Sequence, residues 1–172
     1  MLGLVGHIIL FILLLFVTVY LVYTQFIHRG AVYYPSRNEA VRQMLSLAEV
    51  GKGDTVIDLG SGDGRILIEA AKRGAKAIGY ELNPVLVMLS KRNITKAGLS
   101  HRACVYCKSF WLADFSKATV ITLYQFPEYM DKILKKLREA NCSLRVVSNR
   151  YPFPNLTCQK TKRKVYLYQI NP

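Results

Sequence analysis

The chain has 172 residues, of which 24 are Lys or Arg and 11 are Asp or Glu, giving a formal net charge of +13 at pH 7. Half of the residues are apolar (51%), which excludes a disordered chain, and the four cysteines are too few for a disulfide-dense secreted scaffold. A strong net charge beside such an apolar composition predicts two segregated parts, one apolar and one basic.

An apolar segment opens the chain. The first 27 residues contain no Lys, Arg, Asp or Glu, and the run from Ile8 to Val22 is almost wholly apolar. A helical membrane span needs about 20 such residues, and Tyr20, Tyr23 and Phe26 stand where an interfacial aromatic belt would lie. A cleaved signal peptide would need basic residues before the run and a small-x-small site after it, and neither is present. Residues 1–28 are therefore predicted to form an uncleaved transmembrane anchor.

The charges all follow that segment. Every Lys and Arg lies after residue 28, so the positive-inside rule predicts a single-pass membrane protein with its domain, residues 29–172, on the cytoplasmic side, or on the matrix side in a mitochondrion. The stretch from Asn141 to Pro172 contains basic residues and no acid. This stretch forms either a solvated face or a contact with anionic lipid headgroups.

Strand and helix patterns alternate through the domain. Ser36 is predicted to cap a helix, with Glu39 as its capping-box partner. Strands are predicted at residues 55–59, 77–80, 103–106, 118–124 and 144–148, helices at 65–72, 84–97 and 127–140, and a closing hairpin at 156–160 and 164–170. This alternation predicts an α/β fold with a mostly parallel seven-strand sheet, helices on both faces and a terminal antiparallel hairpin.

The most specific motif is the turn Asp58-Leu59-Gly60-Ser61-Gly62-Asp63-Gly64. Its D-x-G-x-G-x-G spacing differs from the G-x-G-x-x-G of dinucleotide-binding folds, because Arg65 occupies the sixth position counted from Gly60. Glycines at 60 and 62 let the backbone approach a nucleoside without a Cβ clash. Glu81 ends the next strand and can accept hydrogen bonds from both ribose hydroxyls. The motif therefore predicts a nucleoside site at the carboxyl end of the first strand.

This motif, followed by an acid at the end of strand two, resembles the Rossmann-like class I methyltransferases, which bind S-adenosyl-L-methionine. More narrowly, the chain resembles a family of membrane-anchored protein-lysine methyltransferases. Its mitochondrial members modify the ADP/ATP carrier and the c-subunit of ATP synthase, and it has prokaryotic relatives. The matching stretches are Tyr33-Tyr34-Pro35-Ser36, Asp58 to Ile66, Gly79 to Pro84, Phe110-Trp111 and Arg150 to Pro154.

The resemblance implies roles for these residues. Asp58 and Glu81 would hold the amino-group side and the ribose of the cofactor, and Asp63 and Arg65 would shape its methionine end. The stretch from Tyr33 to Ser36 would close over it as a lid. Where the family has Asp or Asn before the aromatic pair, near the adenine, this chain has Ser109. The complete predicted cofactor set is Tyr33, Pro35, Ser36, Asp58, Gly60, Ser61, Gly62, Asp63, Gly64, Arg65, Glu81, Leu82, Asn83, Ser109 and Phe110.

The predicted acceptor side is the segment that ends the fourth strand. A lysine acceptor must first lose a proton from an amine whose reference pKa is about 10.4, and a dry aromatic channel favours the neutral amine. Tyr124, Phe126 and Pro127 are predicted to line that channel, and Glu128 to orient the amine. The segment lacks the Asn/Asp-Pro-Pro-Tyr/Phe signature of enzymes that methylate adenine N6 or glutamine, which argues against those acceptors.

Two other functions remain open. The chain could methylate a membrane lipid or quinone, or it could be a non-catalytic cofactor-binding membrane module, because Ser109 departs from the family pattern. The expected partners are a membrane and a membrane-embedded protein substrate. An RNA acceptor is disfavoured, because no aromatic-interleaved RNA platform is evident. No metal is predicted, because Cys104 and Cys107 stand three apart on a strand and would point to opposite faces.

Overall fold

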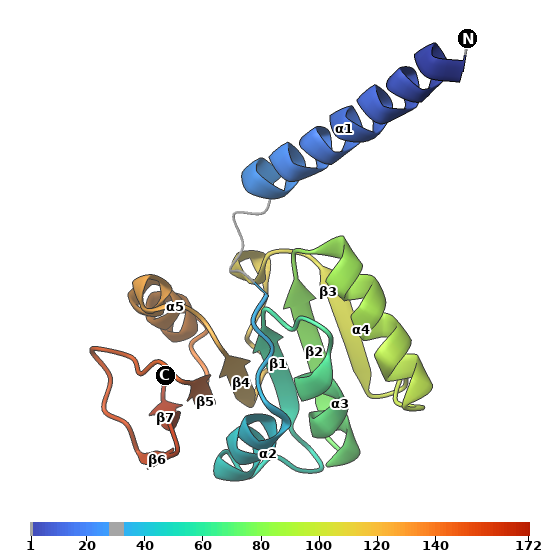
Figure 1. The fold of residues 1–172 in the computed structure, drawn as a ribbon. Coiled ribbons are helices and arrows are strands. Elements are labelled where there is room, and N and C mark those ends of the chain that lie inside the picture. The colour runs from blue at the N-terminus through green and yellow to red at the C-terminus, as the bar shows by residue number, and fades with distance from the viewer. Residues whose placement is uncertain (1, 28–32) are drawn as a thin grey trace. The chain divides into compact units, whose positions relative to one another are not determined.

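The computed structural model describes residues 2–27 and 33–172, in two units that span residues 1–31 and 32–172. The first unit contains one helix, α1 (Leu2–Ile27) (Figure 1). The side chains described in α1 are exposed, so they form no core of their own. The second unit contains the sheet and the remaining helices, and all functional residues considered below belong to it.

The described helices correct the expected localisation. A membrane span must be apolar over about 20 residues, because it has to cross a hydrocarbon layer about 30 Å thick. Across residues 2–27 and 33–172, no helix combines the length and apolar character of such a span. The prediction of a single-pass membrane protein with its domain on the cytoplasmic or matrix side is therefore wrong.

The second unit is built on a seven-stranded sheet of order β3-β2-β1-β4-β5-β7-β6. The first five strands pair in parallel, and β7 runs antiparallel to both β5 and β6. The sheet confirms the predicted mostly parallel class I methyltransferase architecture. The strands are β1 (Thr55–Leu59), β2 (Lys76–Glu81), β3 (Ala103–Cys107), β4 (Val120–Leu123), β5 (Leu144–Asn149), β6 (Lys160–Lys162) and β7 (Val165–Ile170).

The strand order creates a topological switch point at one edge of the sheet, and we call the region outside it the crevice. From β1 the chain adds β2 and β3 on one side, and then crosses to β4 and β5 on the other. The connections that leave β1 and β4 therefore diverge at the carboxyl ends of these two strands. In open α/β sheets this is the point where ligands bind, and it is where the glycine-rich turn lies.

Helices cover both faces of the sheet (Figure 1). One core joins the sheet to α2, α3 and α4, and the other joins it to α5 and the short helix η1. The apolar positions that bury each helix recur at three- and four-residue spacing, as in α5, where Met130, Ile133, Leu134 and Leu137 are buried. The helices are α2 (Asn38–Leu47), α3 (Arg65–Lys72), α4 (Pro84–Lys96), η1 (Phe110–Leu112) and α5 (Pro127–Glu139).

Local signals set most helix ends, with one correction. Asn83 caps α4, because its side chain accepts hydrogen bonds from Val85 N and Leu86 N, and Pro84 stands at the first helical position as expected. Ser36, in contrast, is not a cap. Helix α2 begins at Asn38, and its N-cap Arg37 makes no side-chain capping bond. The Ser36 hydroxyl, one residue earlier, accepts from Asn149 instead.

The closing hairpin differs in register from the prediction. The strand expected at 156–160 is formed instead by β6, Lys160–Lys162. The tight turn that follows uses Arg163 and Lys164, both with positive φ, which is the backbone form of a two-residue hairpin loop. Just before β6, Gln159 N already donates to Leu167 O of β7 at 2.8 Å, whereas residues 154–156 form a turn. That turn follows buried Phe153, whose backbone N–H donates to the Tyr168 hydroxyl at 3.0 Å.

Candidate active site

The glycine-rich turn follows β1 directly and lines the floor of the crevice. Gly60, Gly62 and Gly64 all have positive φ, at 85°, 53° and 83°, a conformation that residues with a Cβ rarely adopt. A Cβ on Gly60 would lie 2.8 Å from the Gln125 side-chain nitrogen, and one on Gly62 would lie 2.9 Å from the Tyr33 ring. The turn therefore needs glycine both for its backbone path and for the close approach of its neighbours.

Glu81 joins the end of β2 to this turn. Its Oε2 accepts a hydrogen bond from Gly62 N at 2.9 Å, and its Oε1 accepts one from Asn83 N at 2.8 Å. A carboxylate has about four acceptor sites, so both oxygens retain capacity for a further donor. The half-buried Glu81 thus keeps free acceptor capacity beside the turn, and its contact with a ribose stays a prediction.

Asp58 lies beneath the turn and is buried. The pKa of its carboxyl is raised to about 7, chiefly by burial and further by the negative charges of Glu81 and Asp63. The Thr122 hydroxyl donates to Asp58 Oδ1 at 2.8 Å and lowers that pKa in part. A buried carboxyl with a raised pKa is stabilised in its ionised form by a nearby cation. Asp58 is therefore suited to a ligand that carries an ammonium group.

Asp63 and Arg65 form an ion pair that links the turn to the segment of residues 33–36. Arg65 donates to both carboxylate oxygens of Asp63, at 2.9 and 2.7 Å, and its third nitrogen donates to Ser36 O at 2.7 Å. Burial raises the pKa of Asp63, but the hydrogen bonds and charge of Arg65 outweigh it and lower that pKa overall. The Ser36 hydroxyl accepts from Asn149 Nδ2 at 3.0 Å, so Ser36 holds the segment to β5 instead of capping α2.

Tyr33 begins this segment and lies over Gly62. Its hydroxyl hydrogen-bonds to the Asp63 carboxylate, and burial is the main cause of its raised pKa. Pro35 is exposed, whereas Ser36 is buried. The structure thus brings Tyr33 and Ser36 to the turn, with the exposed Pro35 between them, and the closing of this segment over a cofactor stays a prediction.

Three further residues predicted to bind cofactor, Ser61, Leu82 and Asn83, lie in or beside the turn. The Asn83 side chain caps α4, and only its backbone N–H reaches Glu81. The Ser61 hydroxyl is buried without a hydrogen-bond partner among the described residues, and it packs against Gly79, where a Cβ would lie 2.5 Å from it. Leu82 follows Glu81 and is exposed.

Ser109 and Phe110 lie beyond β3. The Ser109 hydroxyl accepts from Trp111 N at 3.3 Å and caps η1. The Phe110 ring packs on Trp111 with ring centroids 4.6 Å apart. The shorter Ser side chain is thus committed to its own turn, which explains how η1 forms without the Asp or Asn expected from the family pattern.

An aromatic cluster stands beside the crevice at the end of β4. The Tyr124 ring lies 6.0 Å from Tyr34 and 6.2 Å from Tyr151, and the Phe126 ring lies 6.4 Å from Tyr151. The Arg150 guanidinium lies 5.9 Å from the centre of the Tyr151 ring and hydrogen-bonds to Tyr124. The structure therefore brings together Tyr124 and Phe126, which the sequence predicted, with three residues from elsewhere in the chain.

Sequence reasoning did not assign Tyr34, Tyr151 or Arg150 to the acceptor side. The signal that could have found them was their place in the two stretches Tyr33–Ser36 and Arg150–Pro154, which carried the family resemblance. Pro127 opens α5. Glu128, in the first turn of that helix, is exposed and has no hydrogen-bond or ion-pair partner among the described residues, so it contacts neither the cluster nor the turn.

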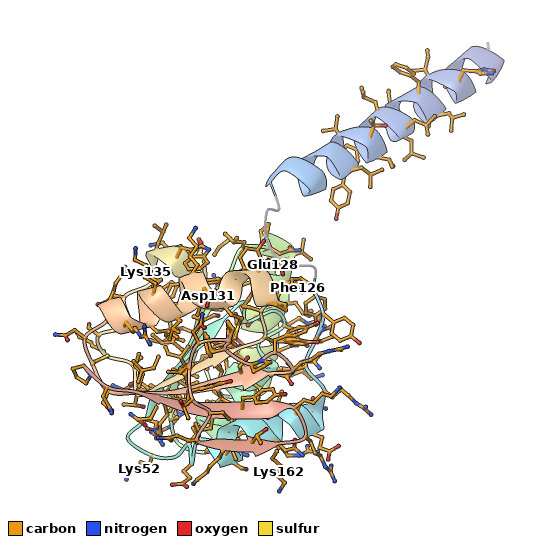
Figure 2. All side chains as sticks on the ribbon, turned by 90° about the vertical axis from the view of Figure 1, so that its left-hand side faces the viewer. Lys52, Phe126, Glu128, Asp131, Lys135 and Lys162 are labelled. Atoms are coloured by element: carbon orange, nitrogen blue, oxygen red, sulfur yellow. The ribbon has the colours of Figure 1, made fainter. Side chains whose placement is uncertain are left out.

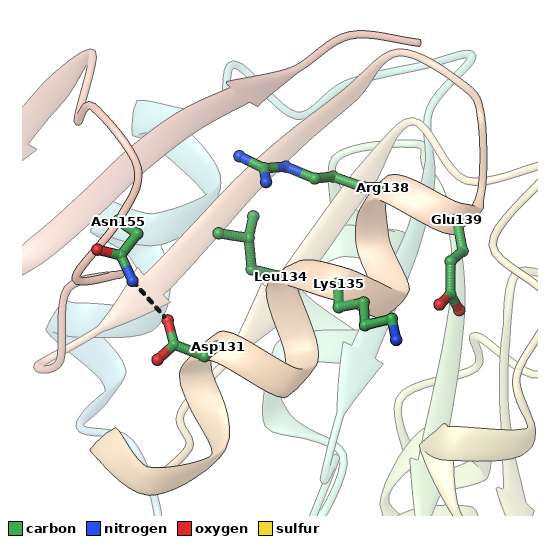
Figure 3. Close-up of a pocket in the computed structure, with 6 residues that line it drawn as sticks. All are labelled: Asp131, Leu134, Lys135, Arg138, Glu139 and Asn155. Atoms are coloured by element: carbon green, nitrogen blue, oxygen red, sulfur yellow. Dashed lines mark hydrogen bonds between the residues drawn. The ribbon is translucent and has the colours of Figure 1, made fainter.

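A separate hollow lies on the outer face of α5 (Figure 3). Its lining includes Leu134, Lys135 and Arg138, and Asn155 Nδ2 donates to Asp131 Oδ1 at 3.1 Å across it. The hollow contains neither the glycine-rich turn nor the aromatic cluster, so it is not part of the crevice. In residues 2–27 and 33–172, no group of three or more His, Cys, Asp or Glu side chains is arranged to hold a metal ion.

Comparisons with known proteins agree with this geometry. Residues 58–160 match the family described as the ANTKMT methyltransferase domain. The chain is 39% identical to a Xenopus laevis lysine N-methyltransferase of the ATP synthase c-subunit over 124 residues, which are 72% of this chain and 54% of that protein. It is 38% identical to a protein-lysine N-methyltransferase of Saccharolobus islandicus (strain REY15A) over 122 residues, 69% of this chain and 76% of that protein.

A solved structure is also similar. It is described as an RNA methyltransferase from Salinibacter ruber in complex with S-adenosyl-L-homocysteine, and it is 35% identical, with a TM-score of 0.78 over 80% of this chain and 94% of that chain. The chain spans about half the length of the Xenopus laevis relative. The family match covers the turn, Glu81, the aromatic segment after β4 and the following strand. The chain therefore belongs to the ANTKMT methyltransferase domain family.

Proposed function

We propose that this chain is an S-adenosyl-L-methionine-dependent protein-lysine N-methyltransferase. The observation that carries the proposal is the placement of two half-sites on one edge of the sheet. The glycine-rich turn with Asp58 and Glu81 suits a nucleoside bearing an ammonium group, and the aromatic cluster around Tyr124 lies beside it. The names of the relatives and the S-adenosyl-L-homocysteine bound to the Salinibacter ruber protein support the same assignment.

The residues of the crevice fit this cofactor. Glu81 would accept the ribose hydroxyls with the lone pairs that Gly62 N and Asn83 N leave free. Asp58 would face the ammonium of the methionine part, and Tyr33 would cover it from the lid. Phe110 and Leu82 would border the adenine. The sulfonium of the bound cofactor supplies an already activated methyl group.

The protein's own contribution is alignment and exclusion of water. Holding an amine in line with a reactive methyl group can supply several kcal/mol of the barrier reduction. A lysine with a pKa of about 10.4 is less than about 0.1% neutral at pH 7. The aromatic rings of Tyr34, Tyr124 and Tyr151 desolvate an entering amine, and the cationic Arg150 beside them disfavours a second positive charge. Both effects lower the pKa of the acceptor lysine.

The acceptor in this proposal is a lysine of a membrane-associated protein. The Xenopus laevis relative is named for a component of ATP synthase, and the aromatic cluster suits a long aliphatic side chain with a single amine. RNA is the competing acceptor, because the Salinibacter ruber protein is described as an RNA methyltransferase. Against RNA, the stretch from Leu123 to Pro127 lacks the signature expected for adenine N6.

The test is an acceptor assay with radiolabelled S-adenosyl-L-methionine. Purified full-length chain is incubated with membrane fractions, total RNA and a lipid extract, and the label is followed into each, with mass spectrometry of the labelled protein. Methyl groups on a specific lysine support the proposal. Label in RNA, or in a lipid or quinone, overturns the lysine assignment, and no label anywhere, with cofactor bound, favours a non-catalytic module. A Glu81→Ala chain is the matched negative control.

A further inference from the structure

The exposed apolar side chains of the second unit are distributed unevenly. Those that are large and exposed among its described residues come from the lid segment, the carboxyl ends of β2 and β3, η1, the first two turns of α4 and the start of α5. All of these segments border the carboxyl edge of the parallel strands, where the crevice opens. We call the part flanking the crevice on its two helices the apolar rim: Leu82, Val85, Met88, Leu89, Phe126 and Tyr129.

On α4 the apolar rim is followed by a band of cations. Val85 and Met88 are 65% and 72% exposed, and residues 85, 88 and 89 share one helical face. Lys91, Arg92 and Lys96 come next along the helix and are exposed, and α4 contains no acidic residue. At 1.5 Å per residue, Arg92 lies about 6 Å further along the axis than Met88.

Helix α5 presents a mixed surface on the other side of the crevice. Phe126 and Tyr129 are exposed at its beginning, and Lys132 and Lys135 follow. Glu128 and Asp131 also lie here, so α5 is less basic than α4. Figure 2 shows Phe126, Glu128, Asp131 and Lys135 at one end of the unit and Lys52 and Lys162 at the other. Phe126, where the apolar rim meets α5, therefore lies at the end of the unit opposite Lys52.

We propose that the apolar rim rests on the surface of a lipid bilayer that carries anionic headgroups. Peripheral apolar side chains enter the headgroup and acyl boundary to a depth of about 5–10 Å, and Arg92 lies about 6 Å from Met88 along the axis of α4. Arg92 would then lie at the level of the phosphates and Lys96 about two turns beyond Met88 on the water side of them, and each basic residue is attracted by the negative surface. The formal net charge of +13 gives the same attraction at longer range.

The arrangement of the two helices favours a planar occupant. Helices α4 and α5 cover opposite faces of the sheet, so an occupant that contacts both ends of the apolar rim must extend across the mouth of the crevice. A bilayer surface does this and places the crevice at the interface. The contact involves no membrane span, and it is independent of methyl transfer, since it concerns only the surface around the crevice.

The test places a tryptophan probe in the rim of the full-length chain. The native Trp111 is first replaced by Phe, and then Met88→Trp is compared with Lys52→Trp, a matched exposed position at the opposite end. Each protein is added to vesicles of phosphatidylcholine and phosphatidylserine whose acyl chains are brominated. We expect the Met88→Trp probe to shift its emission to the blue and to be quenched several times more strongly than the Lys52→Trp probe.

Charge reversal completes the test. Arg92→Glu with Lys96→Glu should reduce the quenching of the Met88→Trp probe severalfold, and vesicles of phosphatidylcholine alone should do the same. Equal quenching at positions 88 and 52, or none at either, overturns the proposal. A blue shift of the Met88→Trp probe that appears without vesicles and grows with protein concentration assigns the rim to a second copy of the chain and also overturns it. These readouts need no methyl transfer, so they stay distinct from a failure of the proposed function.

Discussion

At the scale of single residues, Glu81 has two roles that experiment can separate. Its carboxylate orders the turn through Gly62 N and Asn83 N, and in the proposed function it also accepts the ribose hydroxyls. Hydrogen bonds to a charged group contribute about 1.5–3 kcal/mol each. Glu81→Ala should therefore weaken S-adenosyl-L-homocysteine binding by at least about tenfold, measured by calorimetry. Glu81→Gln retains one acceptor oxygen, so its dissociation constant should lie between those of the unsubstituted chain and Glu81→Ala. An unchanged dissociation constant for Glu81→Ala would remove the ribose assignment.

The raised pKa of Asp58 makes a prediction about stability. Its pKa is about 7 in the folded chain and about 3.9 in an unfolded one. The folded state therefore binds the proton more tightly. Asp58 does not lower the free energy of unfolding below about pH 4, and it lowers that free energy progressively as the pH rises to about 7. Between pH 5 and 8 the free energy of unfolding should fall by an amount on the order of 3 kcal/mol because of this residue.

Urea unfolding of the chain and of Asp58→Asn at both pH values is the measurement. The amide cannot ionise but still accepts from Thr122, so the free energy of unfolding of Asp58→Asn should fall less from pH 5 to pH 8 than that of the unsubstituted chain. Thr119→Val, at a hydroxyl that donates to Asp54 and not to Asp58, is the control and should keep the original pH dependence. Parallel profiles for Asp58→Asn and the unsubstituted chain would contradict the raised pKa.

At the scale of elements, the segment after β4 separates acceptor binding from cofactor binding. Tyr124 and Phe126 contact Tyr34 and Tyr151, on the acceptor side of the crevice. Tyr124→Ala and Phe126→Ala should lower kcat/KM for the lysine acceptor at least about tenfold, within the range for lost positioning, while the dissociation constant for S-adenosyl-L-homocysteine changes little. Tyr129→Ala, on the next turn, is the control. A matching loss of cofactor affinity would place these rings on the nucleoside side instead.

The cap of α4 gives a second prediction at this scale. Asn83 Oδ1 accepts from Val85 N at 2.9 Å, whereas the backbone N–H of Asn83 reaches Glu81 and survives any side-chain replacement. Asn83→Ala should lower the free energy of unfolding by about 1 kcal/mol, with only a small change in cofactor affinity. Asn83→Asp keeps a capping oxygen and should retain most of the stability. A large loss of affinity with unchanged stability would show that the side chain binds ligand directly.

At the scale of the whole molecule, the second unit is expected to fold without the first. The core of the second unit is complete within residues 32–172, so a fragment of those residues should keep the melting temperature and the cofactor affinity of the full chain. A fragment that begins at Asn38 is the informative comparison. It lacks Tyr33 and the Ser36 carbonyl that accepts from Arg65, so it should melt several degrees lower and bind more weakly. Equal behaviour of the two fragments would show that the lid contributes nothing.

The sequence alone determined the features that depend on neighbouring residues. Alternating strand and helix patterns, the Asn83-Pro84 helix start and the glycine-rich turn are local signals, and the structure confirms each of them. Glu81 was also predictable, because a residue that ends the second strand of a parallel sheet must lie next to the turn that follows the first. The family resemblance extended this to Tyr33 and Ser36, although not to their contacts.

Only the tertiary structure decided which distant residues meet. Tyr34, Tyr124 and Tyr151 are far apart in the chain, and no periodicity relates them. Tyr124 and Tyr151 meet because they follow β4 and β5, which end at the same edge, and Tyr34 lies two residues before Ser36, which Asn149 of β5 holds. Ser36 looked like a helix cap, but Asn149 from β5 offers its hydroxyl a buried partner. The apolar N-terminal residues suggested a membrane span from composition alone, and the described helices did not provide one. Local chemistry selects elements, whereas the order of strands in the sheet, which depends on long-range pairing, determines which side chains share a site.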